Sequence, residues 1–197
     1  MYQYKDISTL TRVTVAALWV LMLTRSLFLG VTFYARAMAS ASRAYSLGGV
    51  IGLTAIIHLL TLAVAFILVG RWIYRASANA HAIGGELTIT PGWAIGWYFV
   101  PLANLVKPFQ AMKETWLASH YGSEWGRGDA TDLLNWWWGL WILSSFINNF
   151  DWRLGEEVPA FGLVAAIIGV PLNLILITLM KQIRDGQRTV RHAEVFA

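Results

Sequence analysis

Long apolar stretches separated by short groups of charged residues dominate the pattern along the chain. Four of them are long enough to cross a bilayer, because a helix needs about 20 residues to span roughly 30 Å of hydrocarbon. They cover residues about 13–35, 46–70, 134–151 and 158–180. Arg25 is the one charged residue in the interior of these stretches. The pattern predicts an all-α polytopic membrane protein with four transmembrane helices in a single membrane domain.

A fifth stretch, Leu87–Val106, is also uncharged and is a rival span. Pro91 and Pro101 each remove a backbone donor and clash with the preceding turn, which interrupts a regular helix. Broken backbone at membrane depth is tolerated only where protein or water satisfies its polar groups. We therefore expect a re-entrant or interfacial segment over about residues 87–116 instead of a fifth crossing.

The distribution of Lys and Arg supports this topology, because basic residues gather in cytoplasmic loops. If segment 87–116 returns to the side that it entered and the N-terminus is cytoplasmic, most basic residues are cytoplasmic. Arg36, Arg43 and Arg153 then lie on the outer side. A full crossing would place more basic residues outside than inside. We therefore predict that both termini are cytoplasmic.

Composition agrees with a lipid environment and excludes several kinds of site. Of the 197 residues, 57% are hydrophobic and 13% are charged, whereas soluble domains carry roughly 25% charged residues. The chain has no cysteine, which excludes disulfides and thiolate metal sites. Its net charge of +4 is spread over short groups beside the apolar stretches, so we expect no nucleic-acid binding.

Tryptophan residues flank the apolar stretches, where amphipathic rings favour the headgroup layer of a membrane. Trp136, Trp137 and Trp138 are expected to mark the cytoplasmic start of the third span. Trp152 is expected to mark its outer end.

Arg25 has the most unfavourable position in the sequence for membrane insertion. An arginine at the middle of a transmembrane helix raises the free energy of insertion by about 2.5–3.5 kcal/mol. One interpretation is a site for an anion, a headgroup or a cofactor carboxylate that faces a cavity. The other is snorkelling toward the outer headgroups, or a purely structural pair. The nearest candidate partners are Asp151, Glu156, Glu157, Asn148 and Asn149.

His58 lies midway along the second span, where a histidine can ligate haem or relay protons. His81, His120 and His192 fall on cytoplasmic segments and offer no second axial ligand. We therefore favour a structural histidine bonded to a neighbouring helix and expect no cofactor and no metal, with His58 as a weak metal candidate. Asn173 in the last span is expected to bond between helices.

Arg71 and Arg75 follow the second span and share a helical face with Asn79, because the three are spaced by four residues. An apolar stripe runs beside that face and comprises Trp72, Ala76, Ala80 and Ile83. Such a helix can lie on the cytoplasmic surface with its arginines on anionic lipid headgroups. The favoured alternative is an ordinary positively charged flank of a span.

Asn104, Lys107 and Gln110 lie around the prolines of the re-entrant candidate. Their side chains can donate to carbonyls that the prolines leave without helical partners, or can bind a phosphate or carboxylate. We favour the first role, in which they tie the segment to neighbouring spans, because broken helices need such partners.

Lys181, Arg184, Arg188 and Arg191 form one stripe after the last span. Basic residues beside a membrane attract anionic lipid by about 1 kcal/mol each. They can equally dock an acidic partner, and a solvated tail is slightly favoured. Gly186 weakens any long helix there.

Three blocks of the sequence carry a family resemblance: RWIYRASAN, TPGWAIGWYFVPLANLVKPFQAMKETW and NWWWGLW. With them, the chain from about Arg71 to the fourth span resembles a bacterial membrane family known as domain of unknown function 4328. The resemblance implies a multi-span protein of the bacterial inner (cytoplasmic) membrane. It implies no established activity and no catalytic residues.

The chain contains no recognisable catalytic motif, and its carboxylates are sparse. We therefore expect a protein that is not an enzyme. The favoured function is a subunit that packs against other membrane proteins, against a second copy, or against lipids. An alternative is an oligomeric channel or transporter whose anion-preferring path is lined by Arg25 and Lys107. A second alternative is a haem-binding redox protein that uses His58.

Overall fold

The structure is a computed structural model that describes residues 2–37, 41–85, 87–154 and 160–196. Six α-helices are α1 (Ser8–Ala37), α2 (Ala41–Gly84), α3 (Pro91–Gly96), α4 (Lys107–Tyr121), α5 (Asp132–Leu154) and α6 (Ala160–Phe196). Three 3-10 turns are η1 (Trp97–Phe99), η2 (Ala103–Leu105) and η3 (Gly122–Arg127). The described residues contain no strand, which confirms the predicted all-α class.

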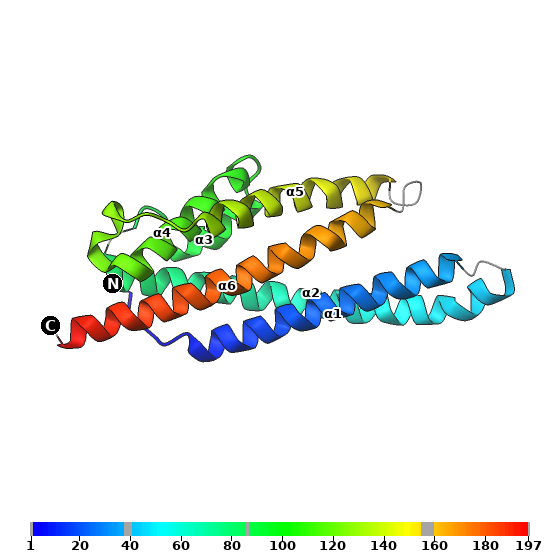
Figure 1. Cartoon of the computed structure of the whole chain (residues 1–197), viewed down its shortest axis with the longest axis horizontal. Coiled ribbons are helices and arrows are strands. Elements are labelled where there is room, and N and C mark those ends of the chain that lie inside the picture. The colour runs from blue at the N-terminus through cyan, green and yellow to red at the C-terminus, as the bar shows by residue number, and fades with distance from the viewer. Residues whose placement is uncertain (1, 38–40, 86, 155–159, 197) are drawn as a thin grey trace.

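Two long helical hairpins form the body of the molecule, one of α1 and α2 and the other of α5 and α6 (Figure 1). The N-terminal segment and the C-terminal end of α6 lie at the same end, which we call the terminal end (Figure 1). The short helices α3 and α4 lie toward that end as well. At the opposite end, the two hairpins diverge (Figure 1).

Three helical segments are long and apolar enough to span a membrane: Ser8–Ala37, Leu47–Gly84 and Gly162–Ala193. They overlap the first, second and fourth predicted spans, and they indicate a multi-pass membrane protein. The third predicted span, 134–151, lies in α5 and is not among them. The tryptophan and asparagine residues of α5 lower its mean hydropathy, although its 23 residues reach about 34 Å.

A compact core fills the terminal end. There α2 continues without a break to Gly84, and the stripe of Trp72, Ala76 and Ala80 is fully buried. The alternative in which this helix lies on the membrane surface with its apolar stripe on lipid does not fit this burial, whereas a flank that continues the second span does. This segment is the last part of α2, and α4 and α6 cover its apolar stripe in place of lipid.

Asn79 is also buried instead of facing headgroups with the arginines. Its Oδ1 accepts the Lys5 N–H at 3.0 Å, and its Nδ2 donates to the Lys5 carbonyl at 2.7 Å and to Gln187 Oε1 at 3.0 Å. Gln187 Nε2 in turn donates to the Ala76 carbonyl and to Ser119 Oγ, at 2.9 and 3.1 Å. This network joins the N-terminal segment, α2, α4 and α6.

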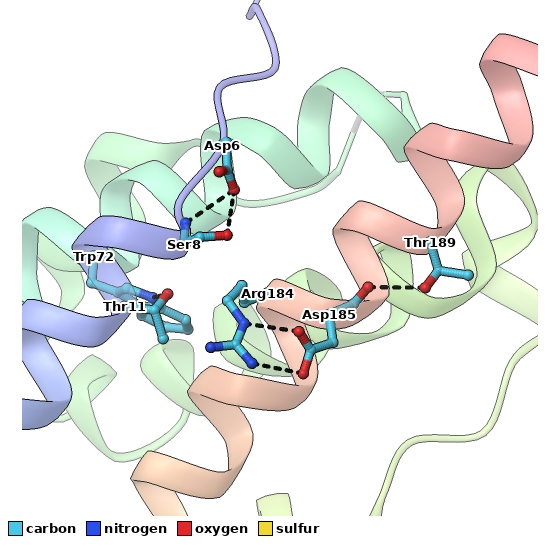
Figure 2. A network of polar contacts seen from close by, with 7 residues as sticks. All are labelled: Asp6, Ser8, Thr11, Trp72, Arg184, Asp185 and Thr189. Carbon is cyan, nitrogen blue, oxygen red and sulfur yellow. Dashed lines mark hydrogen bonds and ion pairs between the residues drawn. The ribbon is translucent and has the colours of Figure 1, made fainter.

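Polar contacts between and within helices at the terminal end are visible in Figure 2. The Trp72 indole N–H donates to Thr11 Oγ1 at 2.9 Å and so joins α2 to α1. At the start of α1, Asp6 accepts the Ser8 N–H and hydroxyl at 3.0 and 2.6 Å. The hydrogen bond from the Ser8 hydroxyl is the main cause that lowers the pKa of Asp6.

The basic stripe at the end of α6 is partly neutralised. Arg184 pairs with the neighbouring Asp185 at 2.8 Å (Figure 2), and α6 remains helical through Gly186 to Phe196.

Two of the tryptophans that were expected at the headgroups belong to the core. Trp137 and Trp138 are buried, whereas Trp136 beside them is 66% exposed. Trp137 and Trp138 are buried because they lie on the face of α5 that packs against the rest of the molecule. The side chain of Trp152 lies outside the described residues.

Candidate functional site

The proline-broken segment leaves the terminal end and returns to it. The backbone N–H groups of Thr88 and Ile89 donate to Glu114 Oε2 at 3.0 and 3.2 Å, and the Thr88 hydroxyl donates to Glu114 Oε1. Gln110 Nε2 donates to the same carboxylate at 3.3 Å. Residues on either side of α3, η1 and η2 are thus bonded to one another, so the segment between them is a closed excursion.

The tip of this excursion reaches the apolar part of the hairpins. The Phe99 ring lies 6.2 Å from that of Phe66 in α2, inside the apolar stretch 46–70. Tyr98 meets Trp141 of α5 at 5.8 Å between ring centroids. The excursion therefore packs on the apolar parts of α2 and α5 before it returns to the terminal end.

The predicted polar residues of the segment act mainly within it. Lys107 Nζ donates to Gln110 Oε1 at 3.1 Å, and Gln110 Nε2 in turn donates to Glu114 Oε1. Asn104 lies half-buried in η2, where its backbone N–H donates to the Val100 carbonyl at 2.9 Å. Glu114 was not singled out from the sequence, although it lies one helical turn after Gln110 and two after Lys107.

Arg71 and Arg75 lie on α2 just past its apolar part. Arg71 is exposed, and Arg75 Nη2 donates to the Gln3 carbonyl at 3.2 Å. Their binding to anionic lipid stays a prediction.

A cleft of about 390 Å³ lies between the two hairpins and gathers residues that the sequence singled out separately. Arg25 of α1, His58 of α2, Asn148 of α5 and Asn173 of α6 all line it. Four helices therefore each contribute a polar side chain from within a span that the sequence predicts. We call this space the polar cleft.

The Arg25 guanidinium lies beside α6, since a Cβ added to Gly169 would lie 3.8 Å from Nη1. Of the partners considered for Arg25, Asn148 is the one that lines the polar cleft. The side chains of Asp151, Glu156 and Glu157 lie outside the described residues.

His58 contacts the neighbouring helix, as expected. Its Nδ1 is 3.5 Å from Thr24 Oγ1 of α1, and its ring stacks on Phe28 with 6.1 Å between centroids.

The hydrogen bond of Asn173 differs from the predicted bond between helices. Its Nδ2 donates to the Gly169 carbonyl of its own helix at 2.8 Å, because that carbonyl lies one turn away on the same face.

Arg25 and Lys107 lie at different depths. The end of η2 next to Lys107 meets α5 at Trp138, whose indole N–H donates to the Leu105 carbonyl at 3.0 Å. The polar cleft meets α5 at Asn148, ten residues and about 15 Å further along the helix. The structure therefore separates the two cations along the bundle, and the alternative in which both line one anion-preferring path stays a prediction.

An apolar groove of about 420 Å³ adjoins the polar cleft, with Leu21, Leu62 and Asn173 lining both. Its wall includes aromatic side chains from α2, the excursion and α5, namely Phe66, Tyr98, Phe99, Trp137 and Trp141. Together the two cavities form a space that is polar at one end and apolar at the other.

No group of three or more His, Asp or Glu side chains that could hold a metal ion is found among the described residues. His58 thus lies in the polar cleft with amide, hydroxyl and guanidinium neighbours. These neighbours do not support the prediction that His58 is a weak candidate for a metal ligand.

The model of a family described as "Domain of unknown function (DUF4328)" matches residues 34–183. The match covers His58, Asn148 and Asn173, and it begins after Arg25. Comparison with curated proteins gave no match. Comparison with solved structures gave none either.

Proposed function

We propose that this chain, which belongs to the family described as Domain of unknown function (DUF4328), is a non-enzymatic membrane subunit. In this proposal, which rests on the geometry of the chain, it packs against lipid and other membrane chains. The observation that carries the proposal is the exposure of large apolar side chains on α1 and α2. The two hairpins diverge away from the terminal end (Figure 1). In the most apolar windows of α1 and α2, 11% of the residues are buried.

Helices of this kind need an apolar environment. Large apolar side chains are exposed along the apolar parts of both helices, for example Leu23 at 68%, Leu60 at 63% and Phe66 at 62%. Burying them from water is favourable by about 25 cal/mol per Å². Bilayer lipid covers these faces, and a second copy or a different membrane protein can replace part of that lipid.

The proposed topology has four spans, with α5 as the third, and an excursion that does not cross. Both termini then lie in the cytoplasm, and the location is the bacterial inner membrane. Two features support it: the excursion is closed by Glu114, and the N-terminal segment and the C-terminal end of α6 lie at the same end of the molecule (Figure 1). The exposed Arg71 and the basic end of α6 then face the cytoplasmic leaflet, whose anionic lipids attract them.

The proposal is tested by extracting the protein with a mild detergent and measuring its mass under native conditions. We expect bound lipid, a second copy or a partner chain to remain attached. A sample washed extensively in a harsh detergent is the control that gives the mass of the bare chain. A monodisperse monomer without lipid after the mild extraction contradicts the proposal.

A further inference from the structure

We propose that the apolar groove binds an isoprenoid quinone, with the quinone ring against the aromatic wall and the tail among the aliphatic side chains. A quinone ring is flat and uncharged, and its carbonyl oxygens accept hydrogen bonds. The inference rests on the proposed function for the membrane environment that supplies such a ligand. Three features of the groove carry it: an uncharged wall, aromatic side chains, and donors that the protein does not use.

The wall of the groove favours an uncharged ligand. No Asp, Glu, Lys or Arg is among the described residues that line it. A charged group in apolar surroundings is costly unless it is paired, so a phosphate or carboxylate is disfavoured here. The volume of about 420 Å³ lies within the range of roughly 300–1,000 Å³ that is usual for ligand pockets, whose walls are mostly apolar with a few polar groups.

Aromatic side chains form much of this wall. They come from α2, the excursion and α5, and are Phe66, Tyr98, Phe99, Trp137 and Trp141. The rings of Phe66 and Phe99 meet edge to face, as do those of Tyr98 and Trp141. A pair of aromatic rings gains about 0.5–1.5 kcal/mol beyond the area that it buries. Such a wall therefore suits a flat ring better than a plain acyl chain.

Two of these aromatic side chains carry donors that are available to a ligand. Neither the Tyr98 hydroxyl nor the Trp141 indole N–H is hydrogen-bonded to a described residue, and the two rings lie 5.8 Å apart between centroids. Neither donor is sealed off, because the described residues include no enclosed side-chain N or O without a partner. In apolar surroundings a donor without an acceptor is unfavourable. A carbonyl oxygen of the quinone supplies that acceptor.

The groove can be reached from the bilayer. Phe66 and Phe99 belong to its wall and are both exposed, so in the proposed topology this side faces hydrocarbon. A ligand dissolved in the bilayer then enters without crossing water. The acyl chain of a phospholipid can enter too, but its ester oxygens are joined to a charged headgroup. The uncharged wall therefore favours the quinone.

The test measures binding of decylubiquinone to purified delipidated protein by native mass measurement, beside decylbenzene, which has the same tail but no carbonyl oxygen. We expect decylubiquinone to bind more tightly. Tyr98→Phe keeps the ring and removes the hydroxyl. It should weaken decylubiquinone binding about fivefold, the loss of one neutral hydrogen bond, and leave decylbenzene binding unchanged. Tyr34→Phe is the matched control, because Tyr34 is exposed on α1 outside both cavities.

A second variant fills the groove without removing a donor. Gly70 of α2 lines the groove, and a Cβ added there meets no atom within 4 Å. Gly70→Leu therefore places a side chain in open space and also raises the helix propensity of α2. It should weaken binding of both ligands about tenfold. Gly52→Leu is the matched control on the same helix, equally open but outside both cavities, and should bind like the wild type.

Four results overturn the inference. They are equal binding of decylubiquinone and decylbenzene, an equal effect of Tyr98→Phe on the two ligands, unchanged binding in Gly70→Leu, and displacement of decylubiquinone by an equal concentration of palmitoyl-oleoyl phosphatidylcholine, which would indicate an acyl-chain groove. In each case the protein can still retain lipid or a partner chain, and the proposed function stands. Loss of all lipid and partner chains from the wild type after mild extraction would instead remove the proposed function, whatever the delipidated protein binds.

Discussion

A buried hydrogen bond at the terminal end links the first two helices. The Trp72 indole N–H donates to Thr11 Oγ1, and both side chains are fully buried. A buried donor without an acceptor costs about 1–3 kcal/mol. Thr11→Val keeps the shape of the side chain but removes the acceptor, so it should lower the free energy of unfolding by that amount. Thermal or denaturant unfolding in detergent measures the change.

Thr14→Val is the matched control for this prediction. Thr14 is equally buried on α1, but its hydroxyl donates to the Leu10 carbonyl of its own helix, which already accepts a backbone N–H. Its replacement should cost clearly less. In a Trp72→Phe background, which lacks the indole donor, Thr11→Val should have little effect. An equal cost in both backgrounds would contradict the assignment.

The residues of the polar cleft show what a sequence reveals at this scale. Arg25, His58 and Asn173 were singled out because a polar group inside an apolar stretch is costly and therefore conspicuous. Glu114 and Gln187 were not singled out. They lie in ordinary polar surroundings along the chain, and their burial follows only from the packing of α4 and α6.

At the scale of elements, Gly186 permits a close approach of two helices. A Cβ at this position would lie 2.5 Å from the Ser119 carbonyl oxygen of α4. Alanine is the better helix former by about 1 kcal/mol, but the clash is with backbone and cannot be relieved by a side-chain rotation. Gly186→Ala should therefore destabilise the protein, by about 1–3 kcal/mol.

Gly139→Ala in α5 is the control, because no atom lies within 4 Å of its added Cβ. It should be neutral or slightly stabilising when both variants are compared by thermal unfolding in detergent. A stabilising Gly186→Ala would show that α4 and α6 do not pack as closely as the structure places them.

The same glycine explains a limit of prediction from the pattern. Along the sequence, Gly186 is a weak point of a helix, and the apolar period stops near Met180. The structure extends α6 to Phe196, since tertiary packing overrides a small difference in propensity. The continuation of α2 to Gly84 has the same cause: its buried stripe packs on α4 and α6.

At the scale of the whole molecule, the closed excursion makes a prediction about sidedness. The chain lacks cysteine, so single cysteines can be introduced without background. Gln3→Cys, Ser123→Cys and His192→Cys are at exposed positions and should react with a membrane-impermeant thiol reagent from the cytoplasmic side. Arg36→Cys should react from the opposite side.

Labelling in intact and in opened spheroplasts separates the two sides. If residues 87–106 crossed the bilayer, Ser123→Cys and His192→Cys would be labelled with Arg36→Cys, and the proposed topology would be wrong. Labelling of Ser123→Cys with Gln3→Cys but of His192→Cys from the other side would instead exclude α5 as a span.

The sequence by itself determined that the chain is helical, that it belongs in a membrane, and which polar residues lie inside the apolar stretches. Hydropathy and charge are properties of local segments, so the pattern along the chain carries them. Only the tertiary structure decided that Arg25, His58, Asn148 and Asn173 share one cleft, and that Asn79 and Glu114 hold the terminal end together. Those facts depend on the packing of segments far apart in the chain, and no local pattern contains the distance between two helices.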